Sequence, residues 1–363
     1  MVDVVIVGGA IAGSTCAIEL AQLGCSVALI EKDVQPRHKL CGEFLSGEVA
    51  SKLNKLGVLD AVLDRGAVPI NSSVITSLSG STTKADIPGN ALGLSRYALD
   101  TLLRTQAASQ GVDLIEGSVS DVRREGDAYC VTHSGGKICA RVVVGAYGRR
   151  SLLDRKMKRH FLNNTYPYVA FKTHVLGIDT ADRVELFAFA GGYCGMSMVE
   201  NNRANVCWVM HQHVLKTAGG SVEAVWDDVL TTNQALAEYL HGSTRQIDFC
   251  SASQLFFEDK ESVVDGTLLI GDAAGMIAPL AGDGMAMAID SALIAASQIK
   301  GFLAGDQSRR QMEEEYSRKR KRSFRMRMFA ARALHGAFVR PGISNLAVPI
   351  AAAVPGITSG LVA

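Results

Sequence analysis

Three glycines and one acid near the start of the chain have the types and the spacing that bind a dinucleotide. Gly8, Gly9 and Gly13 separate an apolar, β-branched run from a helical pattern, and Glu31 ends the next apolar run. Gly8 permits a tight turn, Gly13 lets the helix approach the sheet, and the helix N-terminus offers free N–H groups to a pyrophosphate. Glu31 can accept hydrogen bonds from a ribose diol. The middle glycine of the usual G-x-G-x-x-G pattern is Ala10 here, so an ordinary β-α-β unit with a glycine-rich turn is the competing interpretation.

A second acid and a second group of glycines follow the apolar run at residues 268–271. Asp272 comes directly after that run, a glycine-rich turn extends to Gly284, and a long apolar helix is predicted from Met285 to Leu303. The N-terminus of this helix is a second place where backbone N–H groups and a helix dipole can stabilise negative charge. The two turns therefore predict one nucleotide-binding domain that is built from two separated parts of the chain.

The elements between these turns predict an α/β fold. Buried β-branched runs without alternation are typical of a parallel sheet with both faces covered. From residue 166 to about 250 the pattern changes to short strand-like segments separated by turns, which predicts an antiparallel sheet inserted between the halves of the parallel sheet. The predicted division is 1–165 for the first part of the nucleotide domain, with a short excursion into the substrate domain near 70–92; 166–250 for the substrate domain with its antiparallel sheet; 251–305 for the second part of the nucleotide domain; and 306–363 for C-terminal basic and apolar helices.

The composition describes a folded globular protein and limits its partners. The chain has 363 residues, of which 48% are hydrophobic and 20% are charged, and its formal net charge is +1. This balance excludes a disordered chain and gives no bulk charge for binding nucleic acid. No apolar run is expected to span a bilayer, because the closest one, at residues 346–357, is short and contains Pro349 and Pro355.

The eight cysteines form no C-x-x-C pair and no cysteine–histidine cluster at zinc spacing, so we predict no metal site. Reduced thiols in a cytoplasmic protein are the simplest expectation. Met1 leads directly into the first predicted strand, so no signal peptide is expected.

Three separated stretches resemble the FAD-dependent oxidoreductases that are built like p-hydroxybenzoate hydroxylase. They are the N-terminal glycine turn, the helix start at Arg96, and residues 271–275 with Pro279 and the Gly-Asp-Gly at 282–284. Within this superfamily the chain is more similar to the geranylgeranyl reductase-related branch, on the evidence of Cys41-Gly42, Gly275 and the Gly-Gly-Tyr-Cys-Gly at 191–195. The resemblance extends to about residue 305 and implies a Rossmann-like FAD-binding sheet with an antiparallel-sheet substrate domain over the flavin.

The resemblance also implies which positions contact FAD. Reduced flavin carries negative charge on its N1/O2 edge, and a helix N-terminus stabilises that charge. The implied contacts are Gly8, Gly9 and Gly13 at the pyrophosphate, Glu31 at the adenosine ribose, Val119 at the adenine, Arg96 at the phosphate or ribityl region, Asp272 at the ribityl or pyrophosphate side, and Gly282, Gly284 and Met285 at the N1/O2 edge, with Ala10, Ala12, Lys32, Cys41, Gly42 and Pro279 as further cofactor contacts. NAD(P)H is implied as the transient reductant.

Three departures limit what the resemblance implies about the reaction. The second family motif, G-A-D-G, contributes an Asp that helps to organise FAD and reduced nicotinamide, and this chain has Tyr147 there. The geranylgeranyl reductase motif continues with Trp, Phe and Pro after its tyrosine, where this chain has Cys194, Met196 and Ser197. The tryptophan motif of flavin-dependent halogenases, G-x-W-x-x-I-P, is absent, so halogenation is not expected.

Two residues are the candidates for chemistry beside the flavin. Cys41 is implied to lie near the flavin on the side where substrate enters, and a small buried hydrophobic residue is the alternative interpretation. Tyr193 can donate a proton or line the pocket, or it can be an aromatic residue packed at a strand end. His174, His211 and His213 lie on strands of the inserted domain; any one of them could face the flavin, and a structural or exposed histidine is the simpler interpretation. No carboxylate pair and no Ser–His–Asp order indicates hydrolysis, so no general base is assigned.

The segment from Arg318 to Arg327 carries the strongest charge run of the chain. A solvated helix face is the simpler interpretation, and an anionic partner such as an acidic carrier protein, a phospholipid surface or a nucleotide phosphate is the functional one. The apolar tail at residues 347–357 is compatible with peripheral membrane association.

Together these features predict an FAD-dependent oxidoreductase, as a monooxygenase or a related tailoring enzyme of secondary metabolism that acts on a lipophilic or polyketide-like small molecule. Two alternatives stay open. One is a C=C reductase similar to geranylgeranyl reductase, and the other is a flavin-binding redox sensor or scaffold without turnover.

Overall fold

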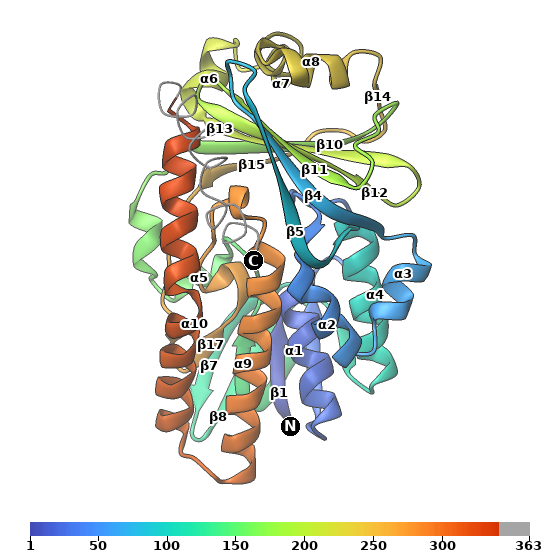
Figure 1. Ribbon diagram of the computed structural model, residues 1–363. Helices are drawn as coiled ribbons and strands as arrows, with labels where there is room; N and C mark the ends of the chain where they lie inside the picture. Colours follow the sequence, from blue (N-terminus) through green and yellow to red (C-terminus); the bar gives the residue numbers. More distant parts are fainter. Residues whose placement is uncertain (341–363) are drawn as a thin grey trace.

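The computed structural model describes residues 1–340, which contain two sheets, one above the other (Figure 1). The lower sheet, sheet A, has eight strands in the order β16-β17-β9-β1-β2-β6, with β8 paired to β9 and β7 paired to β8. Strand β1 runs parallel to both β2 and β9, so Val4 lies opposite Val27 and Val142. The bounds are β1 Val2–Val7, β2 Val27–Glu31, β6 Asp113–Glu116, β7 Val119–Glu125, β8 Ala128–His133, β9 Gly136–Gly145, β16 Val263–Val264 and β17 Thr267–Leu269.

Both faces of sheet A are covered, which explains the unbroken apolar runs. Val4 and Ile6 pack on one face against α1, α4 and α9, whereas Val5 and Val7 pack on the other face against β8 and α5. A strand buried on both sides needs an apolar residue at every position, as the sequence predicted for a parallel sheet. The helix bounds are α1 Ile11–Gln22, α2 Gly47–Lys55, α3 Leu59–Asp64, α4 Arg96–Ser109, α5 Leu152–Lys156 and α9 Gly284–Ala304.

The upper sheet, sheet B, has nine strands in the order β14-β10-β13-β12-β11-β4-β5-β3, with β15 paired to β10. All its pairings are antiparallel except the one between β11 and β4. Strands β4 and β5 contain the predicted excursion near 70–92, and the domain boundaries themselves stay predictions. The bounds are β3 Phe44–Leu45, β4 Val68–Thr76, β5 Thr82–Gly93, β10 Tyr168–Leu176, β11 Arg183–Phe189, β12 Gly192–Val199, β13 Arg203–His211, β14 Thr244–Arg245 and β15 Cys250–Leu255.

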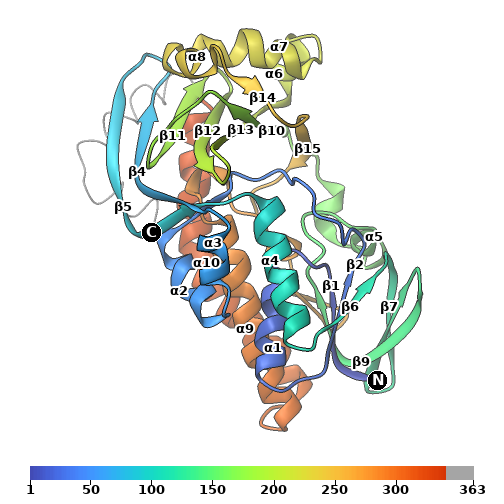
Figure 2. The same cartoon turned by 90° about the vertical axis from the view of Figure 1, so that its right-hand side faces the viewer.

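Short helices cover the outer face of sheet B (Figure 2). One of these helices consists of three pieces, because α7 passes into a π-helical turn, η2, and then into the 3₁₀ turn η3. The bounds are α6 Gln212–Thr217, α7 Val222–Ala224, η2 Val225–Val229, η3 Leu230–Thr232 and α8 Gln234–Leu240.

Two long helices, α9 and α10 (Arg309–Phe338), form the C-terminal part of the described chain. Ser308 and Gln311 form a capping box that starts α10, and the far end of α10 packs against β12 and β13 of sheet B. The 21 residues of α9 meet the length and composition of a membrane-spanning helix, contrary to the expectation that no apolar run would do so. Half of that stretch is buried, and α9 packs between α1 and α10 as a core helix does. The apolar run at 346–357 lies outside the described residues.

One expectation about the cysteines is wrong. Cys130 and Cys139 form a disulfide, although reduced thiols were expected throughout. They lie directly opposite each other on the antiparallel strands β8 and β9. Cys16, Cys25, Cys41, Cys194, Cys207 and Cys250 are free.

Candidate functional site

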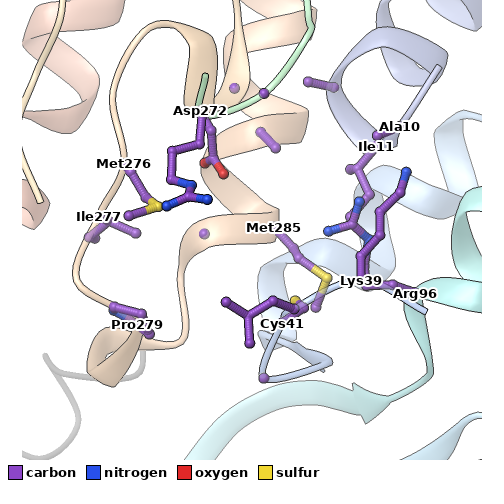
Figure 3. Close-up of a pocket in the computed structure, with 18 of the residues that line it drawn as sticks. Ala10, Ile11, Lys39, Cys41, Arg96, Asp272, Met276, Ile277, Pro279 and Met285 are labelled. Carbon is purple, nitrogen blue, oxygen red and sulfur yellow. The ribbon is translucent and has the colours of Figure 1, made fainter. Parts of the chain in front are cut away.

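A cavity of about 970 Å³ is lined by residues from both sheets. Figure 3 shows part of its wall, with residues of the turns and helices beside sheet A. One end is formed by the turns that follow β1, β9 and β17, which is where open α/β sheets place their ligands. The other end is formed by β4, β11, β12 and β13 of sheet B. The predicted site residues that line this cavity are Gly8, Ala10, Ala12, Glu31, Lys32, Cys41, Gly42, Arg96, Val119, Tyr193, Asp272, Pro279, Gly282, Gly284 and Met285, and only Gly9 and Gly13 do not.

Gly9 and Gly13 shape the first turn from behind the cavity wall. A Cβ atom at Gly13 would overlap the carbonyl oxygen of Gly8, so only glycine lets α1 come this close to β1. Gly8 itself has φ +109, and a Cβ there would overlap the carbonyl oxygen of Ala146. The backbone N–H of Gly9 donates to Glu31 Oε2 at 2.6 Å, which orients the carboxylate at the cavity.

Two long helices begin at the cavity without a side-chain cap. Ala10 precedes α1 and Asp283 precedes α9, and neither side chain accepts a hydrogen bond from its helix, whereas Ser95 and Ser308 cap α4 and α10. The first N–H groups of a helix have no partner inside that helix. Since residues of the first turns of both α1 and α9 line the cavity, it offers two sets of backbone donors with a positive dipole end. These residues fit a dinucleotide that places phosphates at one helix and an electron-rich ring edge at the other.

Asp100 holds two cations at the cavity wall. Arg96 forms two hydrogen bonds with Asp100, Nε to Oδ1 at 2.9 Å and a terminal nitrogen to Oδ2 at 3.0 Å, and Lys39 Nζ lies 2.7 Å from Oδ2. Figure 3 shows Lys39 and Arg96 side by side. Burial would raise the pKa of Asp100, but Arg96 and Lys39 outweigh it and lower the pKa. The carboxylate therefore stays ionised and fixes both cations where an anionic ligand can meet them.

Asp272 follows β17 in the 3₁₀ turn η4 (Gly271–Ala273), and its carboxyl group points into the cavity (Figure 3). Burial raises the pKa of Asp272, against the opposing effect of Lys260. Lys260 Nζ donates to the backbone carbonyls of Arg149 at 2.7 Å and of Asp272 at 3.0 Å, and it lies 4.0 Å from the centre of the Phe161 ring. Burial lowers the pKa of Lys260 to about 7. Lys260 thus ties the turn after β9 to the turn after β17.

A fully buried charge cluster lies behind the loop that carries Cys41 and Gly42. The Glu43 carboxylate accepts hydrogen bonds from Lys172 Nζ and, at 2.7 Å, from His174 Nε2, and none of the three side chains is exposed. Burial would raise the pKa of Glu43, but Lys172 and His174 outweigh it and lower the pKa. The expectation that His174 is structural is confirmed.

The same loop is fixed from two further directions. Asn205 of β13 donates to the carbonyl oxygens of Cys41 at 3.3 Å and of Gly42 at 2.8 Å, and the backbone N–H of Arg96 donates to Glu43 Oε1 at 2.6 Å. Cys41 Sγ accepts from the backbone N–H of Glu43 at 3.4 Å and interacts with the Arg96 guanidinium. The thiol therefore faces the cavity between two donors.

His38, Glu43 and His174 could offer three ligand atoms to a metal ion within 4.8 Å of one another. The Glu43 carboxylate is already bound to the ammonium group of Lys172, which would repel a cation. The cluster therefore supports no metal site, and the absence of a metal stays a prediction.

The end of the cavity under sheet B is mostly apolar. Its wall includes Ile75, Leu186, Val209 and Leu280, which come from four separate elements. Tyr193 lines the same end, and burial raises the pKa of its hydroxyl, which stays protonated. An apolar chamber with few polar groups is typical of a site for a small organic molecule.

Tyr147 lines the cavity, but its hydroxyl is turned away toward α5. It donates to Asp154 Oδ1 at 3.2 Å, and Asp154 forms a fully buried ion pair with Arg159 at 2.9 Å. Burial and the neighbouring Asp154 raise the pKa of Tyr147. Tyr147 therefore places a hydrogen-bonded phenol at the position where the family motif has an aspartate carboxylate.

Several residues of the cavity wall were not predicted from the sequence, among them Lys39, Arg149, Met276 and Leu334. Arg149 follows the turn after β9 and could have been found by its place after a buried strand. Lys39, Met276 and Leu334 belong to no motif, and only the tertiary structure brings them to the wall.

Comparison with known proteins agrees with this geometry, since the FAD binding domain family matches residues 1–330. The chain belongs to this family. It is 26% identical over 337 residues to a tryptophan 2-halogenase of Chondromyces crocatus, an alignment that covers 87% of this chain and 64% of that protein, less than two thirds of its length. It is 25% identical over 320 residues to a 1H-pyrrole-2-carbonyl-[peptidyl-carrier protein] brominase of Pseudoalteromonas luteoviolacea, covering 84% of this chain and 78% of the relative.

Among solved structures, a geranylgeranyl bacteriochlorophyll reductase-like protein of Thermoplasma acidophilum has the same fold. The TM-score is 0.79 at 21% identity, with 99% of this chain and 94% of the other covered. The expected fold class and the expected superfamily are confirmed. The protein is an FAD-dependent oxidoreductase, which favours an enzyme over a sensor without turnover.

Proposed function

We propose that the protein is an oxygen-using FAD enzyme that modifies an electron-rich, mostly apolar small molecule. The observation that carries this proposal is one continuous cavity with two different ends, one made of backbone donors and cations and the other of apolar side chains. When bound, FAD supplies two-electron redox chemistry and reaction with O₂.

The residues of this chain would bind the cofactor and shield the reaction. The first turns of α1 and α9, together with Arg96 and Lys39, would balance the negative charge of the pyrophosphate and of the reduced ring. Sheet B would cover the reacting position and exclude water from it. The electron donor is proposed to be NAD(P)H, and a cytoplasmic location stays a prediction.

A C=C reductase is the second proposal, and Cys41 is the observation that favours it. Its sulfur lies between the Glu43 N–H and the Arg96 guanidinium at the junction of the two ends of the cavity. A thiol held there can give a proton to a carbon of the substrate.

We also propose that the substrate is delivered by an acidic carrier protein that docks on α10. The docking face consists of Arg318, Lys319, Lys321, Arg322, Arg325, Met326 and Phe329. All seven side chains are exposed, Met326 to 67% and Phe329 to 64%, whereas Arg320 of the same run is buried against Asp259 and Arg327 pairs with Glu48. Cations that surround two exposed apolar side chains are suited to an acidic protein surface.

The position of this face supports the same proposal. Leu334 on α10 lines the cavity, and it follows Arg322 by twelve positions, which corresponds to about 18 Å along a helix. A flexible prosthetic arm could span that distance. Two relatives are a brominase and a chlorinase of 1H-pyrrole-2-carbonyl-[peptidyl-carrier protein], whose substrate is held on a carrier protein.

The docking proposal is tested by pulling down the protein with an acidic carrier protein at low salt. We expect Arg322→Glu with Arg325→Glu to lower capture at least about tenfold, and Arg310→Glu, an exposed cation outside the face, to leave it unchanged. Capture that is insensitive to these changes, or flotation with anionic liposomes in place of carrier capture, would refute it.

The reaction is tested by reducing the yellow protein anaerobically with NADH, NADPH or dithionite. The reduced protein is then mixed with O₂ and p-cresol or pyrrole, with and without bromide, and the products are identified by mass spectrometry. We expect gain of one oxygen atom. Gain of bromine would show a halogenase. In a parallel reaction without O₂, reduction of an added unsaturated lipid by the reduced protein would support the second proposal.

A further inference from the structure

Asp283 lies in the turn that starts α9, between two glycines of the cavity wall. Gly282 and Gly284 line the cavity, and Asp283 itself is not part of that wall. The residue is 5% exposed, and its Oδ1 atom has no hydrogen-bond partner among residues 1–340. Its side chain also makes no capping hydrogen bond to α9. A carboxylate with so little contact with solvent and an unpaired oxygen is costly to keep ionised.

Charged side chains from three helices act on the Asp283 carboxyl group. Arg327 of α10 and Lys52 of α2 lower its pKa, and Glu48 of α2 raises it, as does Asp290 of α9. Arg327 and Lys52 both pair with Glu48. Lys52 also lies 2.6 Å from Asp290, so neither cation is reserved for Asp283. Burial is the largest influence and raises the pKa of Asp283 to about 6, so this group changes its charge close to neutral pH.

The charge of Asp283 bears on any negative charge at the cavity side of the same turn. The free N–H groups at the start of α9 stabilise an anion, and this effect is confined to the first turn of the helix. An ionised Asp283 at that turn offsets part of the stabilisation, whereas a neutral Asp283 leaves it whole. Because like charges raise the cost of ionisation, a reduced, anionic flavin at this helix and an ionised Asp283 disfavour each other.

We propose that Asp283 tunes the reduction potential of the bound flavin by taking up a proton when the ring becomes negatively charged. This inference rests on the proposed function, which places the reduced ring at α9. The donor loses two electrons, the flavin gains them with one proton, and a second proton passes from solvent to the Asp283 carboxylate. The coupling is reciprocal, so a proton on Asp283 makes the flavin easier to reduce. Asp283 acts through the helix N-terminus and not by contact with the ring, so it is not a catalytic residue.

The test is a potentiometric titration of the FAD-loaded protein with mediator dyes at pH 5 and at pH 8, without O₂ or substrate. Asp283→Asn keeps the size of the side chain and is neutral at both pH values. At pH 8 we expect the variant to have about a tenfold higher ratio of reduced to oxidised flavin at a fixed potential, which corresponds to about 30 mV. At pH 5, where Asp283 is mostly protonated in the wild type, the two proteins should agree within about twofold. Asp290→Asn, which removes a paired carboxylate from the same helix, should change the ratio less than about threefold.

Equal potentials of the wild type and Asp283→Asn at pH 8 would overturn the inference, as would a shift of the same size at both pH values. Asp283→Ser, a second uncharged variant, repeats the comparison if Asp283→Asn does not hold FAD. Loss of FAD from both variants would also overturn the inference, because a residue that only tunes the potential is dispensable for binding. None of these results decides the reaction with O₂, because the titration contains neither O₂ nor substrate and product analysis reads that reaction separately.

Discussion

The two ends of the cavity are built in different ways. The end at sheet A is made mainly of backbone, in the glycine turns and the N-termini of α1 and α9, and it adds two cations held by one carboxylate. The end at sheet B is made of side chains from β4, β11, β12, β13 and α10. A backbone site imposes strict demands on a few glycines, whereas a side-chain site can be built from many combinations. This difference explains why the cofactor is apparent from the sequence and the substrate is not.

The largest effect is expected at the backbone end. Gly13→Ala would place a Cβ on the carbonyl oxygen of Gly8 and push α1 away from β1, so we expect FAD affinity to fall by at least roughly 100-fold. The measurement is FAD per chain after gel filtration. Gly336→Ala, where a Cβ meets open space, is the matched control. Retention of full yellow colour in Gly13→Ala would contradict this view of the turn.

The next largest effect, on the free energy of unfolding, is expected at Glu43, beside the loop between the two ends of the cavity. Glu43→Gln leaves Lys172 buried without a counter-charge, and breaking a buried pair in this way costs about 3–5 kcal/mol of unfolding free energy. Urea denaturation measures it. Glu314→Gln, which breaks an exposed pair with Arg310, should cost less than about 0.5 kcal/mol. Equal costs at the two positions would show that the buried cluster does not fix the loop of Cys41.

A buried histidine near the end under sheet B should make the free energy of unfolding depend on pH. The pKa of His335 is about 4 in the folded protein against 6.5 ordinarily, so between these values the unfolded chain binds a proton that the folded chain does not. Stability should fall as the pH drops from 6.5 to 4, by up to about 3 kcal/mol from this group. His38, whose pKa burial also lowers to about 4, contributes to the same part of the curve, so His335→Phe should reduce its slope. An unchanged slope would contradict a buried neutral imidazole at His335.

The smallest effect is expected for FAD binding when a residue at the end under sheet B is changed. Tyr193→Phe removes one hydroxyl from the end under sheet B and touches none of the backbone donors. We expect its Kd for FAD to stay within about twofold of the wild type, a change below about 0.5 kcal/mol. Flavin fluorescence on dilution measures this Kd. Loss of FAD comparable to that of Gly13→Ala would mean that the two ends are not separable.

Local patterns predicted much of the fold because their physical demands are local. The unbroken run of β1 requires cover on both faces, and Gly13 requires a close approach of backbone, so both could be read from neighbouring residues.

Other features depend on partners far away in the chain and were not predictable. Glu43 meets Lys172 and His174 across more than 120 positions, and no spacing rule connects them. The disulfide needed the exact register of β8 against β9, which places Cys130 opposite Cys139. The sequence places His335 in a basic helix, and only the tertiary structure shows that α10 ends among the aromatic side chains beneath sheet B.

A crystal structure of the FAD-loaded protein with p-cresol tests the central claim most directly. The account predicts the dinucleotide along the wall from Gly8 to Arg96, and the phenol under sheet B among Ile75, Leu186 and Val209. A flavin ring that fills the space under sheet B, or a phenol bound among the cations at the other end, would contradict the division of the cavity into a cofactor end and a substrate end.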